Sequence, residues 1–217
     1  MKNFITAPVN FISALCICLV FSFSGYAQTS NTLEIGDLAP SVSYSMMNVD
    51  GSQVSITDIN GENGALVIFT CNSCPFVVGR GETTEGWEGR YNGIIELAAE
   101  NGFGTLLVNS NAARRSDSDS FVKMKSRAME MGYLAPYVLD EESKLANNFG
   151  ARTTPHVFLF NSVLELIYTG AIDDSVDSAE EVEKHYLKDA LIRSALGKRI
   201  KTKSTKAVGC SIKRAKS

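Results

Sequence analysis

The chain has 217 residues, a formal net charge of −3 and a hydrophobic fraction of 44%. This length is enough for one domain with a full hydrophobic core, and the hydrophobic fraction is ordinary for a globular protein. The slightly negative charge argues against a nucleic acid as a partner.

The start of the chain has the pattern of a secretion signal. Lys2 is its only charge, an apolar run covers 11–21, and Gly25-Tyr26-Ala27 places small residues where a signal peptidase reads. The apolar run is shorter than the roughly 20 residues that a membrane span needs. We therefore predict a signal peptide at 1–27, cleaved before Gln28, and a periplasmic or secreted protein without a stable membrane span. An uncleaved anchor is the alternative.

Cleavage would leave three cysteines, Cys71, Cys74 and Cys210. Three cysteines do not form a disulfide framework; they are one close pair and one separate thiol. In an oxidising compartment the close pair is expected to form a disulfide unless another protein reduces it.

The hydrophobic pattern predicts one α/β domain. Residues 28–36 are expected to be a flexible lead-in, and the alternating segments 41–46 and 53–56 predict a β-hairpin in front of a buried strand at 65–70. After Pro75 we predict an interrupted helix with a loop or kink at 79–90, a helix at 91–101 and a buried strand at 104–109 that is parallel to the first. An amphipathic helix at 117–131, a short strand at 137–139 and a short helix at 141–149 are expected next. The last predicted elements are a strand at 155–160 paired with one at 164–168, and a helix at 178–196 with Val182, Tyr186 and Ala190 on its core face.

The predicted domain covers 28–197 and is followed by a basic tail at 198–217 that contains Cys210. From Gly197 onward the chain has eight basic residues and no acidic one. We interpret the tail as solvated; docking onto an acidic partner or an anionic membrane surface is the alternative.

The chemistry of the chain is expected at Cys71-Asn72-Ser73-Cys74-Pro75, which follows the buried strand. Two thiols at the start of a helix gain from its unpaired N–H groups and its dipole, which stabilise the nucleophilic thiolate. We predict that Cys71, as the more exposed and N-terminal thiol, attacks a substrate sulfur and that Cys74 resolves the mixed disulfide. Asn72 and Ser73 would tune the pair through hydrogen bonds to Cys71. No positive residue is adjacent in sequence.

Two other interpretations of the pair stay open. One is a structural disulfide in a non-catalytic binding domain. The other is half of a zinc site, which would need ligands from Cys210, His156 and His185. We predict neither a metal nor another cofactor.

A second motif, Thr153-Thr154-Pro155, opens the predicted strand at 155–160. The order of elements, with Cys-x-x-Cys and then Thr-Pro, resembles thioredoxin. The resemblance implies a thioredoxin-like fold, a central mixed sheet flanked by helices with the β-hairpin as an N-terminal extension. It also implies a cis-proline at Pro155, where the backbone of Thr154 and Pro155 binds the substrate beside the two cysteines.

The resemblance narrows to the peroxiredoxin-like thioredoxins of the redoxin branch. Its motifs lie at 69–77, 109–111, 153–160, 170–174 and 209–213, and it covers about 34–214. It implies disulfide exchange with protein or small-molecule thiols and with an unidentified redox partner.

The chain departs from the peroxiredoxin motif Pro-x-x-x-Thr-x-x-Cys. The motif places a threonine three residues before its cysteine. When Cys71 is aligned with that cysteine, Ile68 stands at the threonine position, and when Cys74 is aligned with it, Cys71 stands there. An extracytoplasmic thiol–disulfide oxidoreductase is therefore the leading prediction. A redoxin-type thiol peroxidase or antioxidant protein is the alternative.

Two further residues have open roles. Four roles are open for Cys210: an inert thiol, a second resolving thiol, an anchor of the tail and a bridge between chains. We hypothesise that the tail folds back and places Cys210 near the active face. His156 is interpreted as a packed strand residue, with a proton shuttle as the alternative. Trp87 is expected to pack over the interrupted helix.

Overall fold

The structure, a computed structural model, describes Met1 and residues 32–215. The predicted signal peptide, apart from Met1, lies outside the described residues, as do 28–31 of the predicted lead-in. Residues 32–36 are not a flexible lead-in, because they are hydrogen-bonded to the domain: the N–H of Leu33 donates to Phe149 O at 3.1 Å and that of Gly36 to Leu166 O at 2.9 Å.

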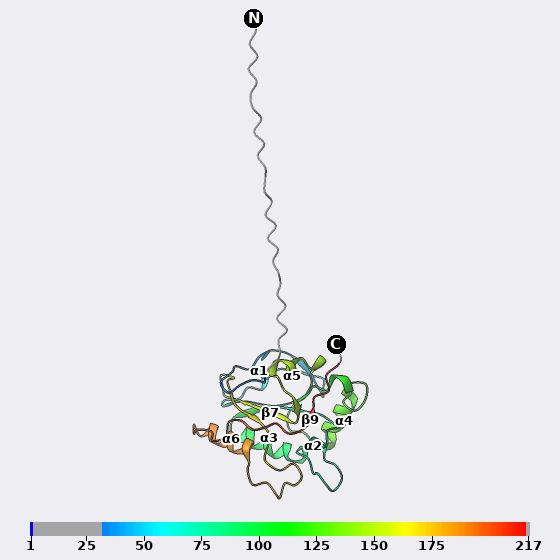
Figure 1. Cartoon of the computed structure of the whole chain (residues 1–217), viewed down its shortest axis with the longest axis vertical. Coiled ribbons are helices and arrows are strands. Elements are labelled where there is room, and N and C mark those ends of the chain that lie inside the picture. The colour runs from blue at the N-terminus through cyan, green and yellow to red at the C-terminus, as the bar shows by residue number, and fades with distance from the viewer. Residues whose placement is uncertain (2–31, 216–217) are drawn as a thin grey trace.

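A seven-stranded mixed sheet forms the centre of the fold, in the order β2-β1-β5-β4-β3-β7-β8 (Figure 1). Parallel pairs join β3 to β4 and β4 to β5, and the other neighbours are antiparallel. The strands are β1 (Met46–Asn48), β2 (Gln53–Val54), β3 (Gly64–Thr70), β4 (Phe103–Asn109), β5 (Tyr137–Leu139), β7 (His156–Phe160) and β8 (Leu166–Gly170). The predicted thioredoxin-like α/β fold with a mixed central sheet is confirmed.

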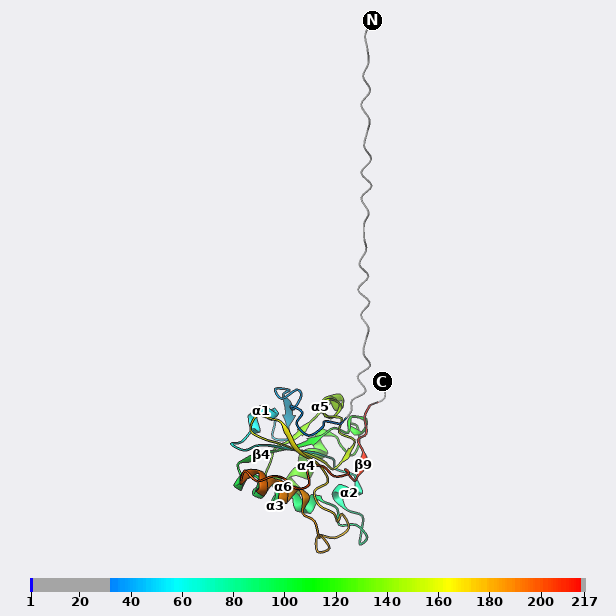
Figure 2. The same cartoon turned by 60° about the vertical axis from the view of Figure 1, so that its left-hand side comes forward.

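Helices cover both faces of this sheet (Figures 1 and 2). They are α1 (Ile56–Ile59), α2 (Pro75–Val78), α3 (Tyr91–Glu100), α4 (Phe121–Met131), α5 (Lys144–Phe149) and α6 (Tyr186–Ala195), with short 3₁₀ turns η1 (Glu88–Arg90), η2 (Ala112–Arg114) and η3 (Glu141–Ser143). Leu66 and Ile68 of β3 pack with α3 and α6, whereas Val67 and Phe69 pack with α1 and α5. Because alternate strand residues point to opposite faces, one continuous apolar run fills both cores.

The predicted hairpin exists but is shifted along the chain. β1 and β2 pair with Met46 opposite Val54, and β1 also pairs with β5, so the hairpin extends one edge of the main sheet. Residues 41–45 are not a strand, because Ser41 adopts a left-handed φ of 55° and the N–H of Tyr44 donates back to Ser41 O at 2.9 Å.

Two predicted helices start later than expected. α6 begins at Tyr186 instead of residue 178, because Asp174 Oδ1 accepts the N–H groups of Glu183 and Lys184 and so holds the preceding segment in a loop. Its buried residues are Leu187, Ala190 and Leu191, and the half-buried Tyr186 packs against the same core, as predicted. Val182 lies before the helix and was wrongly predicted on its core face. α4 begins at Phe121 instead of residue 117, and Ser120 caps it.

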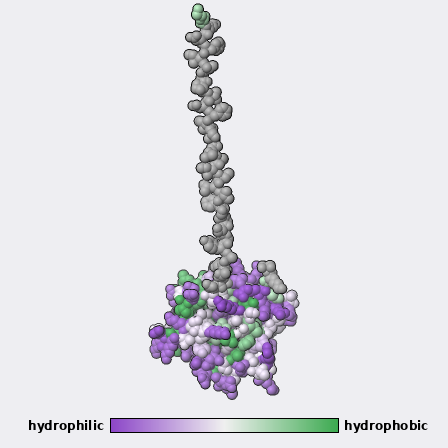
Figure 3. Space-filling model, viewed as in Figure 1, coloured by the Kyte–Doolittle hydropathy of each residue, from purple (hydrophilic) through white to green (hydrophobic). Residues whose placement is uncertain are grey.

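The C-terminal segment lies along the domain. β9 (Cys210–Ser211) pairs with β6 (Thr153–Thr154) in a separate two-stranded sheet, and the N–H of Thr205 donates to Thr169 O at 3.0 Å. No helix in the described part of the chain combines the length and the hydropathy of a membrane span. Figure 3 shows mostly polar residues on one face of the domain, with smaller hydrophobic areas between them.

Candidate active site

Cys71 and Cys74 lie in the turn between β3 and α2. Cys74 is the N-cap of α2 and Pro75 is its first residue. Cys71 is 1% exposed and Cys74 is 3% exposed. The prediction that Cys71 is the more exposed thiol is therefore wrong. α2 has only four residues, and Pro75 offers no N–H, so the helix dipole is a weaker source of thiolate stabilisation than the sequence suggested.

Thr154 contacts both sulfurs. Its hydroxyl Oγ1 lies 3.2 Å from Cys71 Sγ, and its carbonyl oxygen accepts from the thiol of Cys74 at 3.1 Å. The Thr154–Pro155 peptide bond is cis. Residues that are 80 or more positions apart in sequence therefore meet at the end of β3.

The tail places the third cysteine against the pair. Thr154 is opposite Cys210 in the antiparallel β6–β9 pairing, and the N–H of Cys210 donates to Cys74 Sγ at 3.3 Å. The tail thus folds back over the active face, as hypothesised from the sequence.

Hydrogen bonding between the thiols separates their pKa values. The hydrogen bond from Cys71 lowers the pKa of Cys74 to about 5, against the effect of burial, and the side chain and N–H of Cys210 lower it further. The same hydrogen bond raises the pKa of Cys71 well above its ordinary value, and burial and the charge of Asp119 add to this. The directions of the two pKa shifts favour the thiolate at Cys74 and the proton at Cys71. The contact from Cys74 to Thr154 O is a hydrogen bond only while Cys74 is protonated.

The negative charge of Cys74 also affects the pKa of the third thiol, Cys210. Burial, then the hydrogen bond and the charge of Cys74, raise the pKa of Cys210 to about 11, while Lys213 and Arg80 lower it. Arg80 follows Cys74 by six residues, whereas Lys213 is remote from the pair in sequence, so only the tertiary structure brings the charge of Lys213 to the site.

Asp119 organises the turn that carries the pair and was not identified from the sequence. It is fully buried, and its Oδ1 accepts from the N–H of Asn72 at 2.9 Å and from Asn109 Nδ2 at 2.8 Å. Its only signal in the sequence was its place as an acidic residue in the first turn of the helix predicted at 117–131. The side chain of Ser73 donates to Asp119 Oδ2 at 3.4 Å, and the Oδ1 of Asn72 accepts from Tyr137 at 2.8 Å.

Asn72 and Ser73 were predicted to tune Cys71 by hydrogen bonds. Their side chains bond to Asp119, Ser118 and Tyr137 instead, and Ser73 acts on Cys71 through its backbone, which lowers the pKa of that thiol.

His156 is separate from the cysteine pair. It is buried in β7, its Nδ1 accepts from the N–H of Arg152 at 3.3 Å, and its Nε2 lies 3.3 Å from Thr169 Oγ1. Burial, and then Arg152, lower its pKa to about 4. It borders a cavity of about 560 Å³ that contains none of the cysteines. The structure therefore places His156 as a packed, neutral strand residue.

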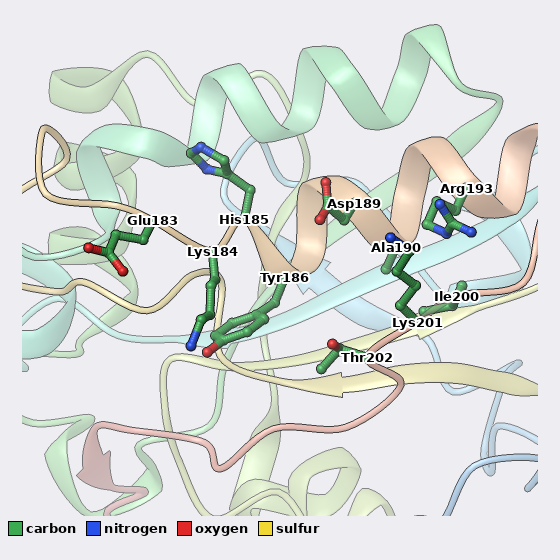
Figure 4. A pocket seen from close by; sticks show the side chains of 10 residues that line it. All are labelled: Glu183, Lys184, His185, Tyr186, Asp189, Ala190, Arg193, Ile200, Lys201 and Thr202. Atoms are coloured by element: carbon green, nitrogen blue, oxygen red, sulfur yellow. The ribbon is translucent and has the colours of Figure 1, made fainter.

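Two other candidates also lie elsewhere. Trp87 is buried and donates from Nε1 to Asp173 at 2.7 Å. His185 precedes α6 beside a cavity of about 210 Å³, in which Lys184 and Tyr186 point the same way (Figure 4). Within 32–215 no three His, Cys, Asp or Glu side chains are grouped as metal ligands.

The three thiols share one cavity of about 320 Å³. Its lining residues are Cys71, Ser73, Cys74, Asn111, Arg114, Asp117, Ser118, Thr154, Cys210, Ser211 and Lys213. The arrangement can accept a thiol or disulfide group at the cysteines in a cavity lined by polar side chains and by charges of both signs.

Comparison with known proteins places this site in context. The redoxin family model matches residues 34–184. An uncharacterized conserved protein of Geobacillus kaustophilus is 30% identical with a TM-score of 0.73, covering 87% of this chain and 96% of that one. A protein of Sinorhizobium meliloti 1021 is 24% identical with a TM-score of 0.73, covering 87% and 98%. The exposed lipoprotein thioredoxin Etrx1 of Streptococcus pneumoniae is 17% identical with a TM-score of 0.50, covering 71% and 98%. The search of curated proteins found no match.

Proposed function

This chain belongs to the redoxin family, and from that premise we propose that it is an extracytoplasmic thiol–disulfide oxidoreductase that exchanges disulfides through Cys71 and Cys74. The contact of both sulfurs with Thr154, the residue before cis-Pro155, carries the proposal. A substrate sulfur that enters the cavity lined by Cys71, Cys74 and Thr154 reaches the pair. The substrates are protein or small-molecule thiols and disulfides, and a separate redox partner regenerates the pair.

Cys74 is the attacking sulfur in this proposal. As a thiolate it attacks one sulfur of a substrate disulfide, and the other substrate sulfur leaves as a thiolate that takes up a proton. Cys71 then gives up its proton and attacks Cys74 Sγ, which releases the second substrate thiol and leaves a Cys71–Cys74 disulfide. These roles reverse the prediction from sequence, because the pKa values favour charge on Cys74.

Trapping the mixed disulfide tests which sulfur attacks. In a Cys210→Ser background, which removes a second thiol able to attack Cys74, Cys71→Ser keeps the attacking thiol and removes the resolving one, so it accumulates a mixed disulfide with a peptide disulfide substrate. Cys74→Ser accumulates none. The opposite result would return the attacking role to Cys71 and leave the activity itself in place.

The reduction potential tests the activity. Equilibration of the mature protein with glutathione or dithiothreitol buffers is expected to give a value between about −120 and −270 mV, the range of working oxidoreductases. A value below about −300 mV would identify a structural disulfide and reject the proposal. Peroxide consumption by the reduced protein at rates that exceed disulfide exchange would favour the thiol peroxidase.

The location is a further part of the proposal. The N-terminal signal pattern supports it, and cell fractionation checks it. The protein is expected in the extracytoplasmic fraction with Gln28 as its first residue. A cytoplasmic protein that keeps Lys2 would contradict it.

A further inference from the structure

The C-terminal segment 209–214 forms a strap across the candidate active site. Beyond the β6–β9 pairing, the N–H of Ile212 donates to Arg152 O at 3.0 Å and that of Lys213 to Asn111 Oδ1 at 2.8 Å. The side chain of Ile212 is 5% exposed and packs in the core beside α5. The strap is therefore seated by a buried side chain and by backbone hydrogen bonds at successive residues.

Gly209 permits the close approach that this position needs. A Cβ at residue 209 would lie 2.2 Å from Thr154 O and 2.7 Å from its carbonyl carbon. Real side chains do not reach such distances from backbone atoms, so a residue without a Cβ stands where the strap crosses the Thr154 carbonyl. The next residue, Cys210, is thereby brought to Cys74.

Cys74 is the sulfur that both other cysteines contact. The N–H of Cys210 donates to Cys74 Sγ at 3.3 Å, and the side chains of both Cys71 and Cys210 lower the pKa of Cys74. All three thiols line the same cavity. A nucleophile at Cys210 is thus next to the sulfur at the centre of the cluster.

We propose that Cys210 is a third redox thiol that exchanges with the Cys71–Cys74 disulfide to form a Cys74–Cys210 disulfide. The inference rests on the proposed function, because it starts from the oxidised pair. The Cys210 thiolate attacks Cys74 Sγ, the Cys74–Cys210 bond forms, and the Cys71–Cys74 bond breaks. Cys71 leaves as a thiolate and takes up the proton that Cys210 lost. One disulfide is exchanged for another, so no external oxidant is needed.

The charges around Cys210 favour this order of events. In the reduced protein, burial and the negative charge of Cys74 hold the pKa of Cys210 high. Oxidation of the pair removes the charge on Cys74, while Lys213 and Arg80 remain. Formation of the Cys71–Cys74 disulfide therefore makes Cys210 a better nucleophile than it is in the reduced protein. The exchanged form keeps the oxidation level of the pair and ties the strap covalently over β6.

Peptide mapping of the wild-type mature protein tests the exchange. The protein is oxidised, quenched in acid, denatured, alkylated and digested with trypsin. Cys71 and Cys74 share the peptide that ends at Arg80, whereas Cys210 falls in the peptide 207–213. A Cys74–Cys210 disulfide therefore joins two peptides, with Cys71 alkylated, and its share is expected to rise with pH.

Single-cysteine replacements provide the matched comparison. Cys71→Ser retains Cys74 and Cys210, and Cys74→Ser retains Cys71 and Cys210. Intramolecular disulfide formation under mild oxidation is expected to be at least about ten times faster in Cys71→Ser, because only its two thiols are held in contact. In the Cys71→Ser background, Val208→Cys combined with Cys210→Ser moves the second thiol two residues back, outside the cavity lining, and is expected to close as slowly as Cys74→Ser.

The outcomes separate this inference from the proposed function. A wild-type protein with a Cys71–Cys74 disulfide in the working range of potential, but with Cys210 alkylated at every pH, would overturn the role of Cys210 alone. Equal closure rates in the two serine variants would do the same. Failure of the Cys71–Cys74 disulfide to form, or a potential below the working range, would count against the proposed function instead.

Discussion

Asp119 Oδ1 accepts a hydrogen bond from the backbone N–H of Asn72 at 2.9 Å. This contact fixes the turn between Cys71 and Cys74 to the loop that precedes α4, 47 residues later in the sequence. It also places a buried carboxylate close enough to raise the pKa of Cys71. One side chain thus positions the cysteine turn and biases the proton toward the first cysteine.

Replacement of Asp119 by asparagine is expected to lower the pKa of Cys71. The amide keeps an oxygen acceptor for the N–H of Asn72 but removes the negative charge that disfavours a nearby thiolate. The measurement is the rate of Cys71 alkylation against pH, followed on the isolated peptide. Asp117→Asn removes the same charge at a residue that is 62% exposed, where solvent screens it, and is the control. Equal shifts in the two variants would contradict the role of Asp119.

Replacement of Cys71 by alanine is expected to raise the pKa of Cys74. The hydrogen bond from Cys71 is the largest cause of its lowered value of about 5, so its loss moves the pKa toward the ordinary value of 9.0. In the reduced wild type, Cys74 stays ionised above about pH 5, and its alkylation slows only below that pH. In the variant, the decline begins at higher pH. An unchanged alkylation profile would show that the proton is not shared by the pair.

Truncation of Ile212 to alanine is expected to loosen the strap. The lost burial is worth about 2 kcal/mol, the lower end of the range for such replacements, because this residue lies at the edge of the core. The backbone amide of residue 212, which donates to Arg152 O, should then exchange its hydrogen about 30-fold faster. This factor follows from the loss of about 2 kcal/mol, because each 1.4 kcal/mol changes an equilibrium constant tenfold. Hydrogen exchange with mass spectrometry measures it. Val208→Ala, at a residue 36% exposed, should leave exchange nearly unchanged. Equal exchange in both variants would show that Ile212 does not anchor the strap.

Replacement of Asp173 by alanine is expected to destabilise the domain by about 3 kcal/mol. Asp173 is 6% exposed and accepts from Trp87 Nε1 at 2.7 Å and from Arg90 Nη1 at 2.8 Å. Its removal leaves the buried indole N–H without its acceptor and takes the nearer carboxylate from the half-buried Arg90, which keeps Ser175 O and Glu85. Denaturant unfolding of the reduced protein measures the change. The control Glu181→Ala, at an exposed residue, should change stability by less than about 0.5 kcal/mol. A similar loss in both variants would contradict the structural role of Asp173.

Local pattern predicted the elements that depend on local burial. β3, α3, β4 and β7 appear within one or two residues of their predicted bounds. α3 carries a helical repeat, and the three strands are short apolar runs whose length and composition favour a buried strand. The start of α6 could not be predicted in this way. Asp174 accepts the backbone N–H groups of two residues of the predicted helix, and a helix-forming pattern does not reveal that competition.

The sequence by itself determined the α/β class and a Cys-x-x-Cys pair after a buried strand, because these are local features. The resemblance of its motifs to a known family added the thioredoxin-like fold and the family. Only the tertiary structure decided which thiol holds the charge and where Cys210 lies. Those outcomes depend on contacts between Cys74, Thr154 and Cys210 across 80 and 136 residues. A pKa depends on burial and on the partners that folding brings within hydrogen-bond distance, and neither can be predicted from the neighbouring residues in the sequence.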